Sequence, residues 1–145
     1  MTDTHHPAPP SGAPSATDFA ARPLGGARVV VLDADSDGSA SLAGMLRLSG
    51  FDAAEAHTIR EATRLVAATR PRAVLTDLDL PDGDPIRLIR QLHATPGGPV
   101  VVVVTGDTDP ARRTAATAAG AADYFLKPAD PQTLVSRLQH LCHPG

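Results

Sequence analysis

The sequence predicts an α/β fold in which five parallel strands form a doubly wound sheet with helices on both faces. Five short, mostly apolar runs alternate with segments whose apolar residues recur at helical spacing. The runs RVVVL and VVVVT show no polar alternation, which is typical of strands buried on both faces. The 145 residues suit one domain of ordinary size, and an aromatic content of 3% requires an aliphatic core.

Residues 1–26 are predicted to form a disordered tail, and the domain is predicted to occupy 27–145. Prolines recur through the tail and interrupt any helix, with Ser, Thr, Ala and Gly between them. The composition changes at Arg28, where the first apolar run begins. The prolines are Pro7, Pro9, Pro10, Pro14 and Pro23.

The first strand is predicted over 28–33 and the first helix over 36–49. RVVVLD at 28–33 is a β-branched run, and Gly50 gives the helix a stop. FDAAEA at 51–56 is a weaker second strand. The first helix is indicated by apolar residues at helical spacing, namely Leu42, Met45 and Leu46.

A second helix and a third strand follow. Thr58 and Glu61 form a capping box at the start of the helix, and Pro71 stops it. AVLT at 73–76 is the third strand. The apolar stripe of the helix consists of Ile59, Ala62, Leu65 and Val66.

Two more strand–helix units complete the pattern after a third helix. VVVVT at 101–105 and ADYFL at 122–126 are predicted strands, and the alanine-rich segment 110–119 between them is predicted to be helical. Asp130 caps the last helix, with Pro131 at its first position. The third helix is marked by Ile86, Ile89 and Leu92.

Polar residues follow the predicted strands where each one ends. Right-handed crossovers place the carboxyl ends of parallel strands at one edge of the sheet, and such sheets bind ligands there. Side chains from four separate units should therefore meet at this edge. They are Asp33 at the end of the first strand with Asp35 just beyond it, and Asp77, Thr105 and Lys127 at the ends of the third, fourth and fifth strands.

This combination of side chains indicates phosphate chemistry with a metal ion. Clustered carboxylates repel one another unless a cation lies among them, and carboxylate oxygens suit Mg²⁺. A lysine and a threonine hydroxyl can both donate to phosphoryl oxygens. An aspartate can itself accept a phosphoryl group and form an aspartyl-phosphate.

The chain resembles the receiver domains of two-component response regulators over about residues 27–142. The resemblance is carried by VVVLDAD, AVLTDLDLPDGDP, VVVVTG and ADYFLKP, which occur in this order around the first, third, fourth and fifth strands. It implies the flavodoxin-like fold of CheY-like receivers, with strand order 2-1-3-4-5. It also implies that Asp77 accepts a phosphoryl group from a histidine kinase or phosphotransfer protein.

The resemblance implies roles for the other residues of the edge. Thr105 and Lys127 correspond to the family residues that are drawn towards the phosphoryl group. Tyr124 corresponds to the aromatic residue that changes rotamer with that threonine on activation. The implied cofactor is Mg²⁺, and its implied ligands are Asp33, Asp77 and the backbone carbonyl of Asp79.

Three positions depart from the family pattern, the least of them being Gly106, where a small residue, often alanine, is usual. The second residue of the usual acidic pair, a direct Mg²⁺ ligand in the family, is here Ala34. Asp35 is the nearest substitute, although one residue along the chain its side chain points elsewhere. We therefore expect weaker Mg²⁺ binding and slower phosphoryl transfer than in a typical member. The second departure is Pro85 in place of glycine, and proline there can start a helix.

The first functional hypothesis is a single-domain, phosphorylatable response regulator that is not an enzyme in the ordinary sense. The second is a pseudo-receiver that acts as a protein-interaction module, because Ala34 has cost it efficient metal binding. The third is a Mg²⁺-dependent phosphohydrolase that resembles haloacid dehalogenases, with Asp79 as acid and base two residues after the nucleophile. The apolar lead-in, the short chain and the Lys127–Pro128 pair argue against the third hypothesis.

The predicted partners are the kinase or phosphotransfer protein and an unknown downstream protein. A homodimer through the face of the fourth helix, fifth strand and fifth helix is a further expectation. The net charge of −3 and the end of the sequence at Gly145 predict no direct contact with nucleic acid. Without an apolar span or signal sequence, we expect a cytoplasmic protein with no membrane contact.

Other charged residues are expected to play no part at the edge. Asp82 and Asp84 are interpreted as solvated loop charges, favourable near the start of the third helix. Arg112 and Arg113 are expected to face solvent, with contact to a partner protein as the alternative. The single cysteine, Cys142, is interpreted as a small buried hydrophobic residue.

Overall fold

The structure is a computed structural model that describes residues 26–142. Strands and helices alternate strictly along these residues. Apart from Gly26, the predicted tail over 1–26 lies outside the described residues, as do residues 143–145. The elements are β1 (Arg28–Leu32), α2 (Ser36–Leu48), β2 (Asp52–Ala56), α3 (Ile59–Thr69), β3 (Ala73–Thr76), α4 (Pro85–Ala94), β4 (Val100–Thr105), α5 (Pro110–Ala119), β5 (Asp123–Leu126) and α6 (Pro131–Cys142).

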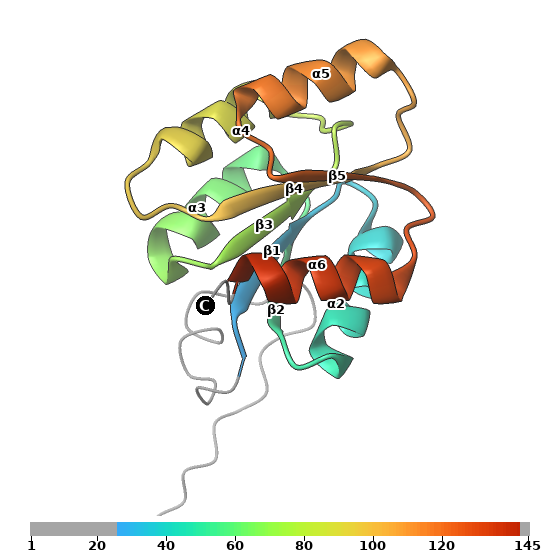
Figure 1. Cartoon of the computed structure of the whole chain (residues 1–145). Coiled ribbons are helices and arrows are strands. Elements are labelled where there is room, and N and C mark those ends of the chain that lie inside the picture. The colour runs from blue at the N-terminus through green and yellow to red at the C-terminus, as the bar shows by residue number, and fades with distance from the viewer. Residues whose placement is uncertain (1–25, 143–145) are drawn as a thin grey trace, which may run out of the picture.

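The strands form one parallel sheet in the order β2-β1-β3-β4-β5 (Figure 1). The order reverses direction between β1 and β3, because the chain first adds a strand on one side of β1 and then winds to the other side. This arrangement confirms the predicted fold class and strand order. It also places the carboxyl ends of β1, β3, β4 and β5 next to one another.

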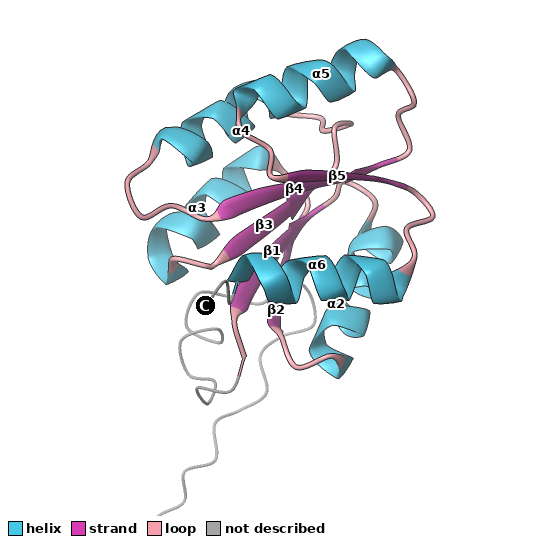
Figure 2. Cartoon of the chain, in the orientation of Figure 1, coloured by secondary structure: helices cyan, strands magenta, loops and turns pink. Residues whose placement is uncertain are grey.

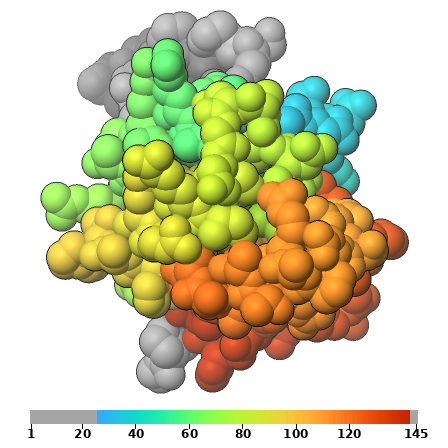
Figure 3. All heavy atoms as spheres, turned by 90° about the horizontal axis from the view of Figure 1, so that it is seen from above, coloured from blue at the N-terminus to red at the C-terminus, as the bar shows by residue number. Residues whose placement is uncertain are grey.

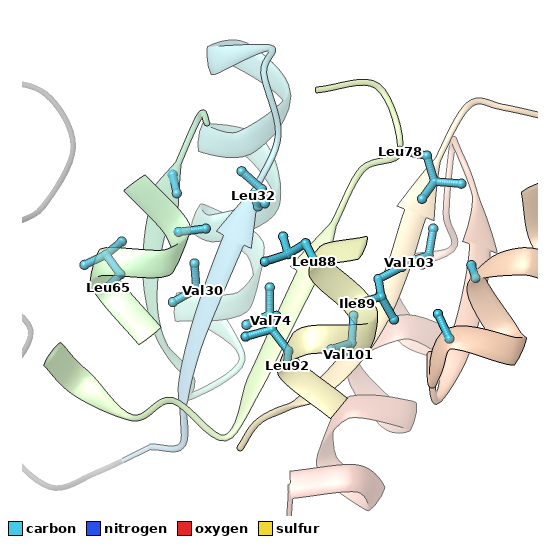
Figure 4. Packing of buried hydrophobic residues seen from close by; sticks show 14 of the residues in the cluster. Val30, Leu32, Leu65, Val74, Leu78, Leu88, Ile89, Leu92, Val101 and Val103 are labelled. Carbon is cyan, nitrogen blue, oxygen red and sulfur yellow. The ribbon is translucent and has the colours of Figure 1, made fainter. Parts of the chain in front are cut away.

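Helices cover both faces of the sheet, with α3, α4 and α5 on one face and α2 and α6 on the other (Figure 2). On the first face, Val30, Val74 and Val101 of three adjacent strands pack with Leu88 and Ile89 of α4 (Figure 4). Residues at alternate positions of the same strands, such as Val29, pack on the second face with α2 and α6. Burial on both faces explains why these strands carry apolar residues at every position.

The helices begin at side chains that accept hydrogen bonds from their first turns. Asp35, Thr58, Asp84 and Asp109 cap α2, α3, α4 and α5 in this way. Asp84 is therefore a helix cap rather than only a solvated charge, and Pro85 is the first residue of α4 as expected. These caps fix the residue at which each of the four helices begins after its preceding loop.

Asp82 has a role that its sequence position did not predict. Its two carboxylate oxygens accept hydrogen bonds from the backbone N–H groups of Ile59, at 2.8 Å, and Arg60, at 3.1 Å. These bonds lower the pKa of the Asp82 carboxyl group. The loop after β3 is thereby joined to the start of α3.

Within residues 26–142, no helix combines the length and the apolar character needed to cross a membrane. Cys142 lies in the core on the α6 side of the sheet with 2% of its surface exposed, and burial raises the pKa of its thiol. It behaves as the predicted buried hydrophobic residue.

Candidate functional site

The sheet brings Asp33, Asp77, Thr105 and Lys127 together at its carboxyl edge. Strand pairing continues into the residues that follow the strands, because the N–H of Asp77 donates to the carbonyl of Leu32 at 2.9 Å. The N–H of Lys127 likewise donates to the carbonyl of Thr105 at 2.8 Å. The backbone register thus places the four side chains beside one another, as the sequence predicted.

Lys127 bridges two of the carboxylates. Its Nζ donates to Asp33 Oδ2 at 2.6 Å and to Asp77 Oδ2 at 2.8 Å. These residues are 94 and 50 positions away in the sequence, so only the completed sheet brings them together. Burial lowers the pKa of Lys127, and the two carboxylates more than offset this, so that its pKa lies above the ordinary value. Lys127 is therefore protonated, and the two carboxylates hold its ammonium group in place.

Asp77 is held by donors on both of its carboxylate oxygens. Besides the bond from Lys127, Oδ1 accepts hydrogen bonds from Thr105 Oγ1 at 2.7 Å and from the N–H of Leu78 at 2.6 Å. Burial raises the pKa of Asp77, but the bonds from Lys127, Thr105 and Leu78 outweigh it, and the pKa lies below 3.8. The carboxylate is therefore ionised at neutral pH, as a nucleophile must be.

Removing the lysine should change the titration of Asp77. In Lys127→Met, we expect the pKa of Asp77 to rise, because the carboxylate loses a hydrogen bond and a nearby positive charge while its burial remains. A pH titration followed by carboxyl ¹³C resonances measures this. In the wild-type protein, Asp77 contributes stability above pH 3.8 that is lost as the pH falls through its lower folded-state pKa. An unchanged pKa in the variant would show that Lys127 does not hold this carboxylate in solution.

Asp33 and Asp35 border a common space beside the first turn of α2. The Asp33 side chain is buried, and its Oδ1 accepts from the N–H of Asp35 at 2.9 Å. A Cβ atom added to Gly38 would lie 3.1 Å from Asp33 Oδ2 and 3.1 Å from Asp35 Oδ2. The glycine thus leaves room between two carboxylates, in a hollow of about 600 Å³ that also includes Lys127.

The carboxylates at this edge of the sheet fit Mg²⁺. Within residues 26–142, no three side chains of His, Cys, Asp or Glu are arranged to hold a metal ion. Mg²⁺ needs only one or two carboxylates, however, because it keeps several waters and takes backbone oxygens. Asp33 and Asp77, which both accept from Lys127, satisfy that need, and Asp35 borders the same space as Asp33 beside Gly38. Lys127 already donates to both Asp33 and Asp77, so the lysine and a cation compete for the same oxygens.

Asp79 is exposed, two residues beyond Asp77. Its N–H points back to Asp77 Oδ1 at 3.3 Å. Its carboxylate makes no hydrogen bond or ion pair with the described residues.

Tyr124 is on β5, next to the loop that follows Thr105, and is 9% exposed. Its hydroxyl donates to the backbone carbonyl of Asp107 at 3.2 Å, and the Arg113 guanidinium stacks on its ring at 5.2 Å from the centroid. Burial and the nearby Asp107 carboxylate raise the pKa of the tyrosine. Tyr124 therefore connects β5 to the loop after Thr105.

The sequence interpretation missed Asp107 and Arg112. Arg112 does not simply face solvent, because it contacts the Asp107 carboxylate and the Leu78 carbonyl. Arg113 is exposed as expected, although its guanidinium stacks on Tyr124. The helical pattern of 110–119 gave no signal for this difference, since both arginines fall at polar positions.

A larger hollow of about 780 Å³ lies between β5 and α6, around the ion pair of Asp123 and Arg137. Its lining includes none of the residues that meet at the carboxyl edge, and we do not assign it to this site.

Comparison with known proteins identifies a family. The family model of the response regulator receiver domain matches residues 29–139. PrrA of Mycobacterium tuberculosis, named a transcriptional regulatory protein, is 39% identical over 114 residues, covering 79% of this chain and 49% of PrrA. MtrA of Mycobacterium leprae, named a DNA-binding response regulator, is 37% identical over 112 residues, covering 77% of this chain and 49% of MtrA.

Solved structures agree with this fold. A CheY-like receiver domain protein from Methanospirillum hungatei superposes with a TM-score of 0.77 at 24% identity, covering 82% of this chain and 95% of that protein. The receiver domain of a response regulator from Bermanella marisrubri gives a TM-score of 0.73 at 28% identity, covering 79% of this chain and 96% of that one.

The same comparison corrects the partner prediction. The chain spans about half the length of the curated relatives that it matches, and MtrA is named as DNA-binding. The prediction of no direct contact with nucleic acid is therefore wrong. It rested on the net charge and on where the sequence ends, and neither observation limits what proteins of this kind contact. The relatives likewise give no support to the predicted single-domain status.

Proposed function

The chain belongs to the response regulator receiver domain family, and we propose that it accepts a phosphoryl group on Asp77 from a histidine kinase or phosphotransfer protein. The observation that carries this proposal is the Asp77 carboxylate itself. It is ionised, and it lies between a lysine ammonium at 2.8 Å and a threonine hydroxyl at 2.7 Å. A carboxylate with a cation and a neutral donor beside it suits attack on a phosphoryl group.

The proposed step is a direct transfer. A carboxylate oxygen of Asp77 forms a bond to phosphorus while the bond between phosphorus and the donor's leaving atom breaks. The electron pair of the broken bond goes with the donor. Asp77 is already ionised, so no base has to take a proton from it. The product is an aspartyl-phosphate.

Lys127 and Thr105 are proposed to stabilise the transferred group. Lys127 already contacts the carboxylate, and its Nζ can donate to a phosphoryl oxygen without a large movement. Thr105 is 1% exposed, and its hydroxyl donates to Asp77 Oδ1. Because this donor is already beside the carboxylate, it can turn to an oxygen of a phosphoryl group on Asp77. When Thr105 turns, the N–H of Asp107, which donates to Thr105 Oγ1 at 3.2 Å, loses or shifts its bond. Tyr124 is bonded to the carbonyl of Asp107, and we propose that it responds in turn.

Mg²⁺ is the proposed cofactor, held by Asp33, Asp77 and the backbone carbonyl of Asp79, with Asp35 as a further oxygen donor. When bound, the ion supplies positive charge that offsets the negative charge of the phosphoryl group. Asp35 can contribute because Gly38 leaves the space between Asp35 and Asp33 open. In this way Asp35 partly compensates for Ala34.

Filling that space should weaken Mg²⁺ binding. Gly38→Ala puts a methyl group 3.1 Å from an oxygen of each carboxylate, so we expect Mg²⁺ affinity to fall by roughly threefold to tenfold. Calorimetric titration with Mg²⁺ measures this without any phosphodonor. Gly44→Ala is the matched control, because it lies in the same helix with nothing within 4 Å. It should leave the affinity unchanged and raise stability by about 0.5–1 kcal/mol. Equal affinities in the two variants would contradict the use of this space.

The receiver is proposed to extend over 27–145, after a disordered tail over 1–26. The names of PrrA and MtrA support regulation of transcription as the class of output. The second candidate, a receiver that is not phosphorylated, is favoured by two observations. Ala34 replaces a metal ligand of the family, and Lys127 binds both remaining carboxylates.

Beryllofluoride with Mg²⁺ separates these two candidates, because it forms a complex with a receptive aspartate that resembles the phosphorylated state. Tyr124 is the chain's only tyrosine and there is no tryptophan, so its fluorescence reports on the site without further labelling. We expect a saturable change in fluorescence in the wild-type protein. A constant signal, together with unchanged NMR resonances around Asp77, would favour the receiver that is not phosphorylated.

A further inference from the structure

Arg112, in the first turn of α5, links the two loops that frame Asp77. Its Nη2 donates to the backbone carbonyl of Leu78 at 2.9 Å, and its Nη1 lies 3.3 Å from Asp107 Oδ2. Leu78 directly follows Asp77, and Asp107 lies two residues after Thr105. Figure 3 shows the yellow-green segment that follows β3 next to the orange segment that includes α5.

These contacts close a ring of hydrogen bonds that begins and ends at Asp77. On one side, the N–H of Leu78 donates to Asp77 Oδ1 at 2.6 Å, and the carbonyl of Leu78 accepts from Arg112. On the other side, Thr105 Oγ1 donates to the same Oδ1 and accepts from the N–H of Asp107. The ion pair of Arg112 and Asp107 joins the two sides.

The exposure of the side chains in this ring indicates whether it contributes to folding stability or to geometry. The Arg112 and Asp107 side chains are 36% and 29% exposed, and an ion pair this open adds little to folding stability. The Leu78 side chain, in contrast, is 2% exposed and packs in the core. The buried Leu78 side chain therefore anchors the backbone to which Arg112 donates. The contact affects the position of that backbone more than the folding stability.

The guanidinium is suited to this arrangement. Its planar fork presents two N–H groups in fixed relation, so one group meets the carbonyl of Leu78 while the other meets the carboxylate of Asp107. A lysine ammonium on a flexible stem cannot reproduce that fixed spacing. Arg113, the next residue, is turned to the ring of Tyr124 instead and provides a natural comparison.

We infer that Arg112 is a positioning residue for phosphoryl transfer, which fixes the backbone after Asp77 against the loop after Thr105. This inference rests on the proposed function. The backbone that Arg112 holds leads directly to Asp79, whose carbonyl is a proposed Mg²⁺ ligand. Small displacements of reacting groups have large effects on rate. Arg112 acts through the Leu78 carbonyl and touches no reacting atom, so it is not a catalytic residue.

The test compares Arg112→Ala and Arg112→Lys with Arg113→Ala. With acetyl phosphate and Mg²⁺, we expect Arg112→Ala to lower the rate constant at saturating acetyl phosphate by about tenfold, with the half-saturating concentration unchanged. Arg112→Lys should restore little, since it keeps the charge but not the fork. Arg113→Ala removes the same charge and should keep the wild-type rate constant. Urea unfolding should give similar stabilities for all variants.

A second readout needs no phosphodonor. Amide hydrogen exchange at Leu78 and Asp79, whose N–H groups both point to Asp77, should be faster in Arg112→Ala and unchanged in Arg113→Ala. If the wild-type protein reacts while Arg112→Ala matches it in rate and in exchange, the inference is overturned and the proposed function stands. A full rate in Arg112→Lys would also overturn it, because charge alone would then suffice. If the wild-type protein takes up no phosphoryl group, the proposed function itself fails, and with it the role of Arg112 in transfer.

Discussion

Asp77→Asn is expected to abolish phosphoryl uptake completely. The amide keeps the size of the side chain and can still accept hydrogen bonds from Thr105 and Leu78. It has no anionic oxygen to attack phosphorus, and so no acyl phosphate can form. Intact-mass measurement after incubation with acetyl phosphate and Mg²⁺ should show the added mass of one phosphoryl group in the wild-type protein and none in the variant.

Asp79→Asn is the matched control for this experiment. It makes the same change two residues away, at an exposed side chain whose carboxylate has no partner among residues 26–142. The backbone carbonyl of residue 79 remains, so uptake should stay close to the wild-type level. Steady release of phosphate from a small phosphoester that is lost in Asp79→Asn would instead support the phosphohydrolase hypothesis. Residual uptake in Asp77→Asn at the wild-type rate would place the acceptor elsewhere.

Ala34→Asp is expected to strengthen Mg²⁺ binding by about tenfold. The position is exposed, so an added side chain has room, and it is the position of the family's second acidic metal ligand. Without the metal, the added negative charge should lower stability, because like charges close together repel. With Mg²⁺ present, the thermal midpoint should rise more than in the wild-type protein, since binding to the folded state stabilises it.

The control for this second prediction is Ala34→Asn, which adds a side chain of the same shape without the charge. It should raise Mg²⁺ affinity much less than Ala34→Asp. Asp35→Asn keeps a residue that can cap α2 and removes one carboxylate charge, so it should weaken binding in the wild-type background. If affinity stays flat in Ala34→Asp, the account of Ala34 as the missing ligand is incorrect.

The residues that meet at the carboxyl edge could be predicted because backbone geometry places them there. Parallel strands with right-handed crossovers end at one edge, so a residue that directly follows a strand has little freedom in where it lies. Asp33, Asp77 and Lys127 are residues of this kind and Thr105 is the last residue of β4, so strand register brings the four close together. The strand order was implied by the resemblance to receiver domains and did not follow from this geometric argument.

The contacts that could not be predicted belong to residues in loops and on helix surfaces. Arg112 and Arg113 are adjacent and chemically identical, and only the path of the loop after β4 decides which one meets the Leu78 carbonyl. Asp82 binds the start of α3 for a similar reason, because the loop after β3 folds back to it. The space above Gly38 depends on the first turn of α2, which the apolar pattern does not describe.

The most direct test of the central claim locates the phosphoryl group on the wild-type chain. The protein is incubated with acetyl phosphate and Mg²⁺, the acyl phosphate is reduced with borohydride, and the modified residue is identified by tandem mass spectrometry. Modification at Asp77 alone, dependent on Mg²⁺, is the predicted result. Modification at Asp33, Asp35 or Asp79 instead, or no modification at millimolar Mg²⁺, would contradict the account.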